Sequence, residues 1–350
     1  MSYKDDKRKE KLVNIAMASG LIAFVCIGGY FLYKHLFKPQ ANIQKLVDKD
    51  KKLVDFMITA DKKGNINLLR VINGENVDKA SLPNGEYKYS ISNKYNQVIA
   101  IDSNTSKLFK IEEVDKKIKV SELATLNNLN FNDIKEMKND NNYLYIMKND
   151  NKSFISVTLD NGKSKEYGLD KEAEKWTVKD EMLIYSNNND ISVINVSNSK
   201  INGIDVGDKT TGFDISNNKL LIFNKFGSGL NHSLVLKANP SNLLIDNLIK
   251  FENKDVEGIN ADKDGTSFMA IVDNNGSKTL ESISSTDDNK VLSSTNINNN
   301  IKIDKHAVGI DSYLYNKTDN DLEVISAETG LTAYSIKDIG ADTIYMPVTK

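Results

Sequence analysis

Seven polar residues occupy comparable places in the sequence, each in or beside a short stretch that precedes an apolar run or ends the chain. They are Ser90, Asp133, Thr177, Asp214, Asn260, Asp304 and Thr343. Three of them are acidic, and a pair of carboxylates is sufficient for the hydrolysis of a glycosidic bond. The same residues are also compatible with strands that face water in a central channel, where polar side chains have no function beyond their solvation.

Other residue types that carry chemistry are scarce. The sequence has one cysteine and three histidines, and His232 and His306 are separated by 74 residues. Common metal sites need several such ligands close together, and no Gly-x-Ser-x-Gly motif marks a nucleophilic serine. We therefore expect no catalytic residue, no metal and no cofactor, and a binding protein before an enzyme.

Two loops have only a superficial likeness to ligand-binding loops. The run DKDG at 262–265 opens like a calcium loop, but an apolar strand follows where further ligands would be needed. The run NKFGSGLNH at 224–232 contains glycines but lacks the ending and the following helix of a phosphate loop. We predict a turn between two strands for the first and a long hairpin loop for the second.

The composition is that of a folded protein without a strong charge bias. The 350 residues include 39% hydrophobic and 27% charged residues and only 4 prolines, which excludes a disordered or collagen-like chain. Forty-six Lys and Arg against 48 Asp and Glu give a net charge of −2, so we expect no nucleic-acid partner. Asn and Lys are abundant and have AT-rich codons, which suggests an AT-rich bacterial genome.

One apolar segment recurs seven times after residue 53. Its copies are DFMITAD at 55, QVIAIDS at 97, YLYIMKN at 143, MLIYSNN at 182, LLIFNKF at 220, FMAIVDN at 268 and SYLYNKT at 312. The anchor residues of these copies are Met57, Ile99, Leu144, Leu183, Leu221, Met269 and Leu314. The anchors are spaced by 42, 45, 39, 38, 48 and 45 residues, a period typical of four-stranded propeller blades.

The flanks of each copy predict three more strands. An alternating strand and a more polar strand follow the apolar segment, and another strand precedes it. The preceding strands are YKYSIS, NDIKEM, KWTVKD, TGFDIS, EGINAD and IKIDKH. The one exception to strands is LLIDNLIKFE at 243–252, whose spacing of apolar residues predicts a short helix.

The two ends of the repeated region are complementary. The first apolar copy, at residue 55, has no preceding strand of its own, whereas the chain ends with an unpaired strand, ADTIYMPV. If that last strand is the innermost strand of the first unit, the ring closes and no sheet edge is left. We predict an all-β fold, a seven-bladed β-propeller closed by its C-terminal strand and preceded by one transmembrane helix. A six- or eight-bladed ring and an open β-solenoid are the alternatives.

Residues 53 to 350 thus resemble the β-propeller superfamily, and in particular its degenerate bacterial members with YncE-like or WD40-like blades. The resemblance is one of architecture. The blades do not end in Trp-Asp, they lack the Gly-Gly of kelch repeats, and Trp176 is the only tryptophan. The resemblance therefore implies the fold and a central channel as the usual ligand position, but it transfers no functional residue.

The N-terminal region predicts a membrane anchor. Residues 12–33 contain no Asp, Glu, Lys or Arg, and a helix of that length crosses a hydrocarbon core of about 30 Å. With the flanking residues, we assign the transmembrane helix to 12–37. A cleaved signal peptide is the alternative, but no cleavage site is evident. A lipoprotein is also disfavoured, because Val25 precedes Cys26 where a small residue is expected.

The flanking charges set the orientation. Five Lys or Arg lie in the 11 residues before the segment and three in the 15 after it, which favours a cytoplasmic N-terminus in a single-pass protein of the cytoplasmic membrane. We expect residues 1–11 inside, 38–52 as a tether and the domain 53–350 outside. The first 39 residues contain seven Lys or Arg and three Asp or Glu, which leaves the remainder a charge of −6, so we expect a monomeric ectodomain.

Two functions are compatible with these features. The first is a protein–protein interaction scaffold, anchored in the membrane and bound to another protein of the bacterial cell envelope. The second is an extracytoplasmic glycan-binding module or glycan-active enzyme, which would use acidic residues such as Asp133 and Asp214 at the mouth of the channel.

Overall fold

The chain divides into two units, Met1–Lys51 and Lys52–Lys350. The computed structural model describes residues 54–90, 97–126, 129–207, 209–216, 218–225, 232–252, 254–262, 265–286, 290–301, 308–310, 313–318, 320–340 and 342–348. The predicted cytoplasmic residues 1–11, transmembrane helix 12–37 and tether 38–52 lie outside these residues. Within the described part of the chain, no helix is long and apolar enough to cross a membrane.

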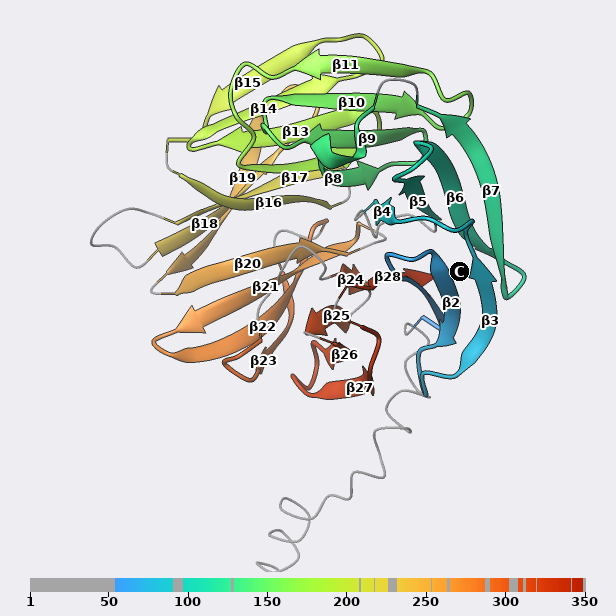
Figure 1. The fold of residues 1–350 in the computed structure, drawn as a ribbon. Helices are drawn as coiled ribbons and strands as arrows, with labels where there is room; N and C mark the ends of the chain where they lie inside the picture. Colours follow the sequence, from blue (N-terminus) through green and yellow to red (C-terminus); the bar gives the residue numbers. More distant parts are fainter. Residues whose placement is uncertain are drawn as a thin grey trace, which may run out of the picture. The chain divides into compact units, whose positions relative to one another are not determined.

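Seven four-stranded antiparallel sheets follow one another in a ring and form a seven-bladed β-propeller (Figure 1). The innermost, or first, strands of blades one to seven are β28 (Ile344–Val348), β4 (Tyr87–Tyr89), β8 (Ile134–Asn139), β12 (Lys175–Lys179), β16 (Thr210–Ser216), β20 (Asp255–Ala261) and β24 (Val308–Ile310). The second strands are β1 (Phe56–Ala60), β5 (Gln97–Asp102), β9 (Tyr143–Lys148), β13 (Met182–Asn187), β17 (Lys219–Lys225), β21 (Ser267–Asn274) and β25 (Tyr313–Thr318).

The outer two strands of each blade complete the sheets. The third strands are β2 (Asn65–Arg70), β6 (Lys107–Val114), β10 (Ser153–Thr158), β14 (Asp190–Asn195), β18 (His232–Ala238), β22 (Ser277–Ser284) and β26 (Asp321–Ser326). The fourth strands are β3 (Asn76–Ser81), β7 (Lys117–Thr125), β11 (Ser164–Gly168), β15 (Ile201–Asp205), β19 (Ile245–Glu252), β23 (Val291–Asn296) and β27 (Thr332–Ile336). A short 3-10 helix, η2 (Phe131–Asp133), precedes β8.

The C-terminal strand closes the ring as the sequence predicts. β28 pairs antiparallel with β1, with Ile58 opposite Met346, and supplies the strand that the first blade lacks. Met346 is fully buried and Tyr345 nearly so. The predicted closure and the seven-blade count are therefore confirmed.

Both faces of every second strand are buried, because side chains alternate between the two neighbouring blades. Met57 belongs to the hydrophobic cluster shared with blade seven, and Ile58 to the cluster shared with blade two. Seven such clusters occur, one at each junction between blades. All seven anchor residues of the repeat have 0% exposed surface. This double burial explains why the second strand is a continuous apolar run in the sequence.

One sequence prediction about elements is wrong. Residues 245–252 form the strand β19 and no helix, because the segment pairs with β18 as the outer edge of blade five. In blade seven the described part of the first strand is β24, at 308–310. Residues 302–306 of the predicted segment 301–306 lie outside the described residues.

The connections between third and fourth strands pack against the fourth strand of the preceding blade. At Gly162 a Cβ atom would lie 2.2 Å from Cβ of Ala124, and at Gly330 it would lie 2.1 Å from the carbonyl oxygen of Asn296. Both glycines have a φ of +67°, in the left-handed region that L side chains rarely adopt. Glycine at these two turns therefore permits close contact between adjacent blades.

Candidate functional site

Six of the seven polar residues expected to line the channel fall within the described residues. Ser90 directly follows β4, Asp214 and Asn260 lie in β16 and β20, and Thr343 directly precedes β28; all four are buried. Thr177 is half-buried in β12. Asp133 is exposed in η2, which precedes β8. The prediction that Asp133 lies in the first strand of blade three is therefore wrong. Asp304 lies outside the described residues.

The strand register brings three of these residues to the same level of the ring. The backbone N–H of Ser90 donates to the carbonyl of the anchor Ile99, and the backbone N–H of Ile99 donates to Ser90 Oγ. Asp214 and Asn260 lie opposite the anchors of blades five and six. In blade three that level is occupied by Asn139, which the sequence analysis missed. The first and second strands are separated by three residues in blade three (β8 to β9) and by seven in blade two (β4 to β5), so counting back from the anchor does not find the equivalent residue.

At this level, polar side chains join neighbouring blades. Oδ2 of Asp214 accepts a hydrogen bond of 2.9 Å from the backbone N–H of Ala261 in the next blade. Asn260 Oδ1 accepts a hydrogen bond from the backbone N–H of Gly309, again in the next blade. Buried backbone amides need such acceptors, since an unpaired one costs about 1–3 kcal/mol. Asp214 and Asn260 therefore stabilise the ring.

Lysines make a second set of contacts between blades. Lys88 Nζ donates to the carbonyls of Phe131 (3.0 Å) and Ile134. Lys138 Nζ donates to the carbonyl of Trp176 at 2.5 Å and lies 4.6 Å from its ring centroid. Burial lowers the pKa of Lys88. Sequence reasoning missed these contacts because a lysine in a strand usually indicates a solvent-exposed position.

Asp140, directly after β8, accepts four hydrogen bonds. Its Oδ1 accepts from the backbone N–H groups of Asn142 (2.8 Å) and Tyr143 (2.7 Å). Its Oδ2 accepts from the hydroxyl of Tyr145 at 3.0 Å and from the backbone N–H of Glu181, in blade four, at 2.9 Å. Asp140 is 1% exposed, so four donors compensate for the burial of its charge.

The described residues contain no group of three or more His, Cys, Asp or Glu that could hold a metal ion. The DKDG run lies between β20 and β21, as predicted for a turn, and Asp262 accepts a hydrogen bond from the hydroxyl of Ser267. The NKFGSGLNH run joins β17 to β18, but its residues 226–231 lie outside the described residues, as does His306. Asp133 and Asp214, considered for glycan chemistry, are separated by two blades.

Three buried side-chain oxygens at the junction of blades four and five have no hydrogen-bond partner within the described part of the chain: Ser186 Oγ, Thr210 Oγ1 and Asn224 Oδ1. Ser186 lies two residues after Ile184, and Asn224 lies two residues after Ile222; both isoleucines belong to the cluster between these blades. Thr210 pairs directly with Asn224. All three side chains therefore face the same junction.

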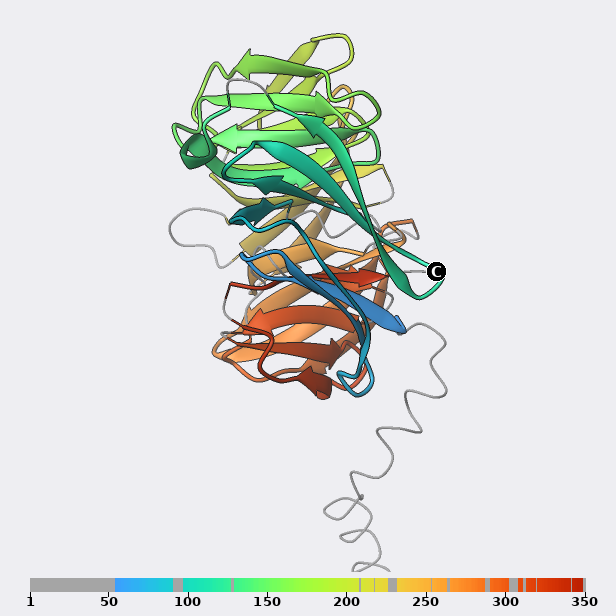
Figure 2. The ribbon, with the colours of Figure 1, turned by 45° about the vertical axis from the view of Figure 1, so that its right-hand side comes forward.

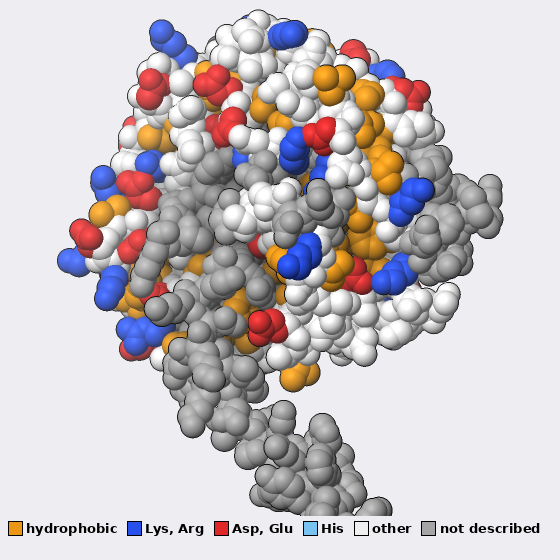
Figure 3. Space-filling model, turned by 180° about the vertical axis from the view of Figure 1, so that it is seen from behind, with side chains coloured by type: hydrophobic (Ala, Val, Ile, Leu, Met, Phe, Trp, Pro, Cys, Tyr) orange, Lys and Arg blue, Asp and Glu red, His pale blue; other side chains and the backbone are white. Residues whose placement is uncertain are grey.

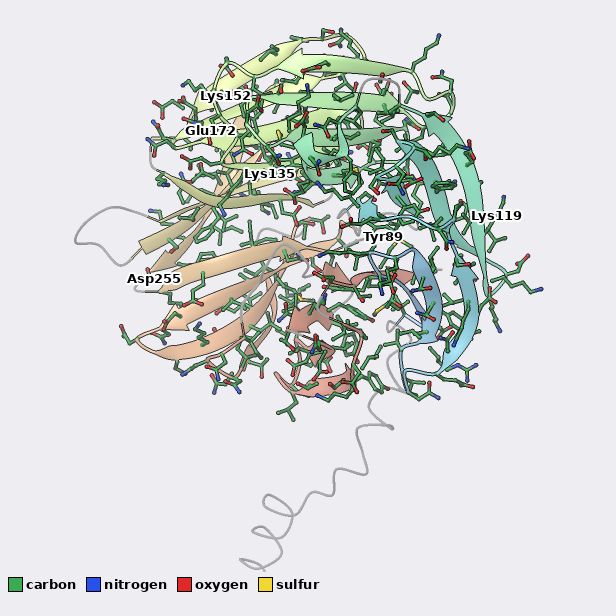
Figure 4. All side chains as sticks on the ribbon, in the orientation of Figure 1. Tyr89, Lys119, Lys135, Lys152, Glu172 and Asp255 are labelled. Atoms are coloured by element: carbon green, nitrogen blue, oxygen red, sulfur yellow. The ribbon has the colours of Figure 1, made fainter. Side chains whose placement is uncertain are left out.

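One face of the ring carries the turns between second and third strands and the connections that lead into first strands. We call it the upper face. In blades three and four its loops are fixed by hydrogen bonds: Lys135 Nζ donates to Asn151 Oδ1 at 2.7 Å, and Asn151 Nδ2 donates to Glu172 Oε1 at 3.3 Å. The backbone N–H of Ala173 also donates to the carbonyl of Asn151 at 2.8 Å. Figure 4 shows Lys135, Lys152 and Glu172 close together over these blades.

Comparisons with known proteins support the fold alone. No family model and no curated protein matches the sequence. A functionally unknown protein from Desulfotomaculum acetoxidans has 12% sequence identity and a TM-score of 0.56, and the match covers 84% of this chain and 100% of the other. BamB from Moraxella catarrhalis matches at 12% identity with a TM-score of 0.43, covering 83% of this chain and 84% of the other. Apo AztD from Citrobacter koseri matches at 10% identity and 0.44, covering 83% and 97%.

Proposed function

We propose that this protein is a membrane-anchored scaffold that binds another protein of the bacterial cell envelope through the upper face of its propeller. The anchor is residues 12–37, and the charge bias around it favours an N-terminus inside the cell and a propeller outside. The ectodomain itself is expected to be monomeric, so the partner is a different protein.

The observation that carries the proposal is the ordered polar surface over blades three and four. Asn151 connects Lys135 with Glu172, and Asn187 Nδ2 donates to the carbonyl of Glu172 at 2.8 Å. These side chains come from different blades and connections, yet each is held in place before any partner arrives. A preorganised surface loses less conformational entropy when it binds a partner, so more of the contact energy is available for affinity.

The glycan alternative is less well supported by the described carboxylates. Both oxygens of Asp214 accept backbone hydrogen bonds, from Ile215 and Ala261, so this side chain is engaged in holding the ring. Asp133 is the exposed carboxylate of the set. The channel-lining role of the seven polar residues stays a prediction, and Asp133→Asn is the variant that tests it: a glycan function predicts loss of glycan binding with normal folding.

Site-specific photo-crosslinking in intact cells tests the scaffold. A photoreactive amino acid at Lys152 or Glu172 on the upper face should capture one protein in stoichiometric yield. The matched control is Lys119, which is also exposed but lies on the outer strand β7 (Figure 4). Capture at Lys152 and Glu172 that does not exceed capture at Lys119 would refute the proposal.

A second variant tests the preorganisation. Asn151 has a φ of 55°, which glycine adopts without strain. Asn151→Gly therefore removes both side-chain hydrogen bonds of Asn151 while leaving the blade cores intact, so the free energy of unfolding should change by about 0.5 kcal/mol. Capture at Lys152 should fall by about tenfold if the ordered surface is the binding site. Unchanged capture would place the partner elsewhere on the propeller.

A further inference from the structure

Exposed large apolar side chains gather at one kind of connection. Nine large hydrophobic residues among those described are exposed, and eight of them lie in or beside the connection between a third and a fourth strand: Ile72, Val114, Ile201, Leu244, Ile245, Val291, Leu292 and Leu331. The ninth, Leu248, lies further along β19. Their exposed fractions range from 38% to 67%. Six of the seven blades have an exposed apolar residue at this connection. We call these six connections the hairpin rim.

The hairpin rim lies on the face opposite the upper face, because strand direction alternates within each blade. The N-terminal end of the domain lies on that same side: β1 is a second strand and begins where third strands end. A hydrogen bond of 3.0 Å from the backbone N–H of Val71, in the first rim connection, to the carbonyl of Asp55 shows this directly. In Figure 2 the tip of β6–β7 and the start of β1 lie on the same side.

Lysines stand beside several of the apolar rim residues. Lys200 directly precedes Ile201, Lys290 directly precedes Val291, and Lys116 and Lys117 follow Val114 closely. Acidic residues are also present, since Glu113 and Asp115 flank Val114. Figure 3, which shows the molecule from behind, has hydrophobic side chains at the surface among charged side chains of both signs. An exposed aliphatic side chain next to a lysine is the composition that suits the boundary between lipid headgroups and acyl chains.

We infer that the hairpin rim rests on the outer surface of the lipid bilayer, so that the propeller stands on the membrane with its upper face turned away from it. The inference depends on the membrane anchor of the proposed function. The tether 38–52 has 15 residues and spans at most about 50 Å when fully extended. Because the anchor and tether keep the propeller near the bilayer, the rim residues meet lipid at a high effective concentration. Several rim side chains that each bind lipid weakly can then hold the propeller on the bilayer together.

The distribution of the rim residues favours lipid over a protein partner. A protein interface needs a contiguous apolar centre from which water is excluded. Here the apolar side chains are spread over separate hairpins of six blades, with polar turns between them. A bilayer is a broad surface that can receive all of these tips at once.

The full chain, reconstituted in vesicles of phosphatidylcholine and phosphatidylglycerol, provides the test. Cys26 is the only cysteine, so a Cys26→Ala background allows single cysteines to be placed at Leu244 or Leu331 on the rim and labelled with an environment-sensitive fluorophore. Lys152→Cys on the upper face is the matched control. Brominated lipids should quench the rim labels about fivefold more than the control label.

The outcomes separate the inference from the proposed function. If the chain does not float with the vesicles, the membrane anchor is absent, and both the proposed membrane-anchored scaffold and the contact of the rim with lipid are wrong. If the chain floats and the rim labels are quenched no more than the label at residue 152, the rim inference alone is wrong. Photo-crosslinking from Leu244 to a protein in native membranes, together with unquenched rim labels, would identify the rim as a protein interface and also overturn it.

Discussion

The upper face and the hairpin rim are built from the same four-strand repeat and have opposite chemistry. On the upper face, loops of different blades exchange side-chain hydrogen bonds, as Asn151 does with Lys135 and Glu172. At the rim, the turns contact the preceding blade through glycine, and apolar side chains such as Leu331 project into solvent. The repeat therefore fixes the fold, while the turn residues at its two ends are free to acquire different binding properties.

The largest effect on both faces is expected from opening the ring, because both depend on the folded propeller. Deleting residues 341–350 removes β28 and exposes the edge of β1, together with partners of Met346 and Tyr345. Burial of two such side chains contributes about 3–6 kcal/mol, a large part of a typical total of about 5–15 kcal/mol. We expect the truncated domain to aggregate or to melt far below the intact one by circular dichroism. A truncation that melts normally would mean that the ring does not depend on β28.

Substitution of Asp140, a carboxylate on the rim side, tests how much the junction of blades three and four contributes to stability. Asp140→Ala leaves four donors, including the backbone N–H of Glu181, without their acceptor. Because unpaired buried groups are costly, the free energy of unfolding should fall by about 3 kcal/mol. Asp140→Asn is the control and should lose less, since one amide oxygen can still accept. A loss below about 1 kcal/mol for the alanine variant would contradict the assigned role.

Alkaline pH should act on the upper face. Burial, followed by the hydrogen bond to Asp170, raises the pKa of Tyr185 to about 12 from the ordinary 10.0. Burial also raises the pKa of Tyr87 and Tyr89, whose hydroxyls donate to the carbonyls of Pro83 and Asp61 on the upper face. The folded state then holds these protons at a pH where the unfolded chain releases them, so stability is complete below pH 10 and falls as pH rises from 10 toward 12.

The measurement is the melting temperature between about pH 8 and pH 12. Tyr185→Phe removes one of the titrating hydroxyls and should flatten part of the decline, at the cost of the bond to Asp170. A melting temperature of the wild type that does not change across this range would show that these hydroxyls ionise as easily in the folded state as in the unfolded one.

The unpartnered oxygens between blades four and five allow a stabilising substitution. Thr210→Val replaces a buried hydroxyl that has no hydrogen-bond partner among the described residues by a methyl group of similar shape, so we expect a gain of about 1 kcal/mol in the free energy of unfolding. Thr210→Ala is the control and should be less stable than the valine variant because it leaves space. Destabilisation by valine would indicate that the hydroxyl has a partner at this junction.

The smallest effect on stability is expected at the rim. Leu331 is 64% exposed, so Leu331→Ser should change the free energy of unfolding by less than about 0.5 kcal/mol. Leu322, in the same blade, has 0% exposed surface, and Leu322→Ala should cost about 2–5 kcal/mol. Chemical denaturation of both variants compares them. A large loss at Leu331 would mean that rim residues serve the fold, which would weaken the case for a binding surface.

The sequence predicts the strands that are buried along their whole length. The seven apolar strands and the closing strand were identified correctly because a strand buried on both faces has no polar gaps. The segment 243–252 was assigned wrongly for a related reason: Ile249 and Phe251 belong to the core between blades five and six, while Leu244 and Leu248 are exposed. Apolar residues on both sides of an edge strand produce a spacing like that of a helix.

The candidate site is predicted less completely, because it depends on contacts between blades. Asp214 and Asn260 were recognised as a comparable pair, but their roles as acceptors for the next blade follow from the register of two sheets. Lys88 and Lys138 donate to carbonyls of a neighbouring blade and have no sequence signal of that role. The rim was missed because single exposed apolar residues in turns are ordinary until the topology places them on one face.

The closure of the ring by β28 also governs when the domain can fold. Of the strands described, β1 comes first in the chain and β28 last, so the first blade lacks its innermost strand until β28 has been synthesised. The contact between them joins residues at opposite ends of the domain, and such long-range pairing forms slowly. For the extracytoplasmic location proposed above, this order has a consequence: the first blade of the exported chain is completed only after β28 has passed through the translocation channel.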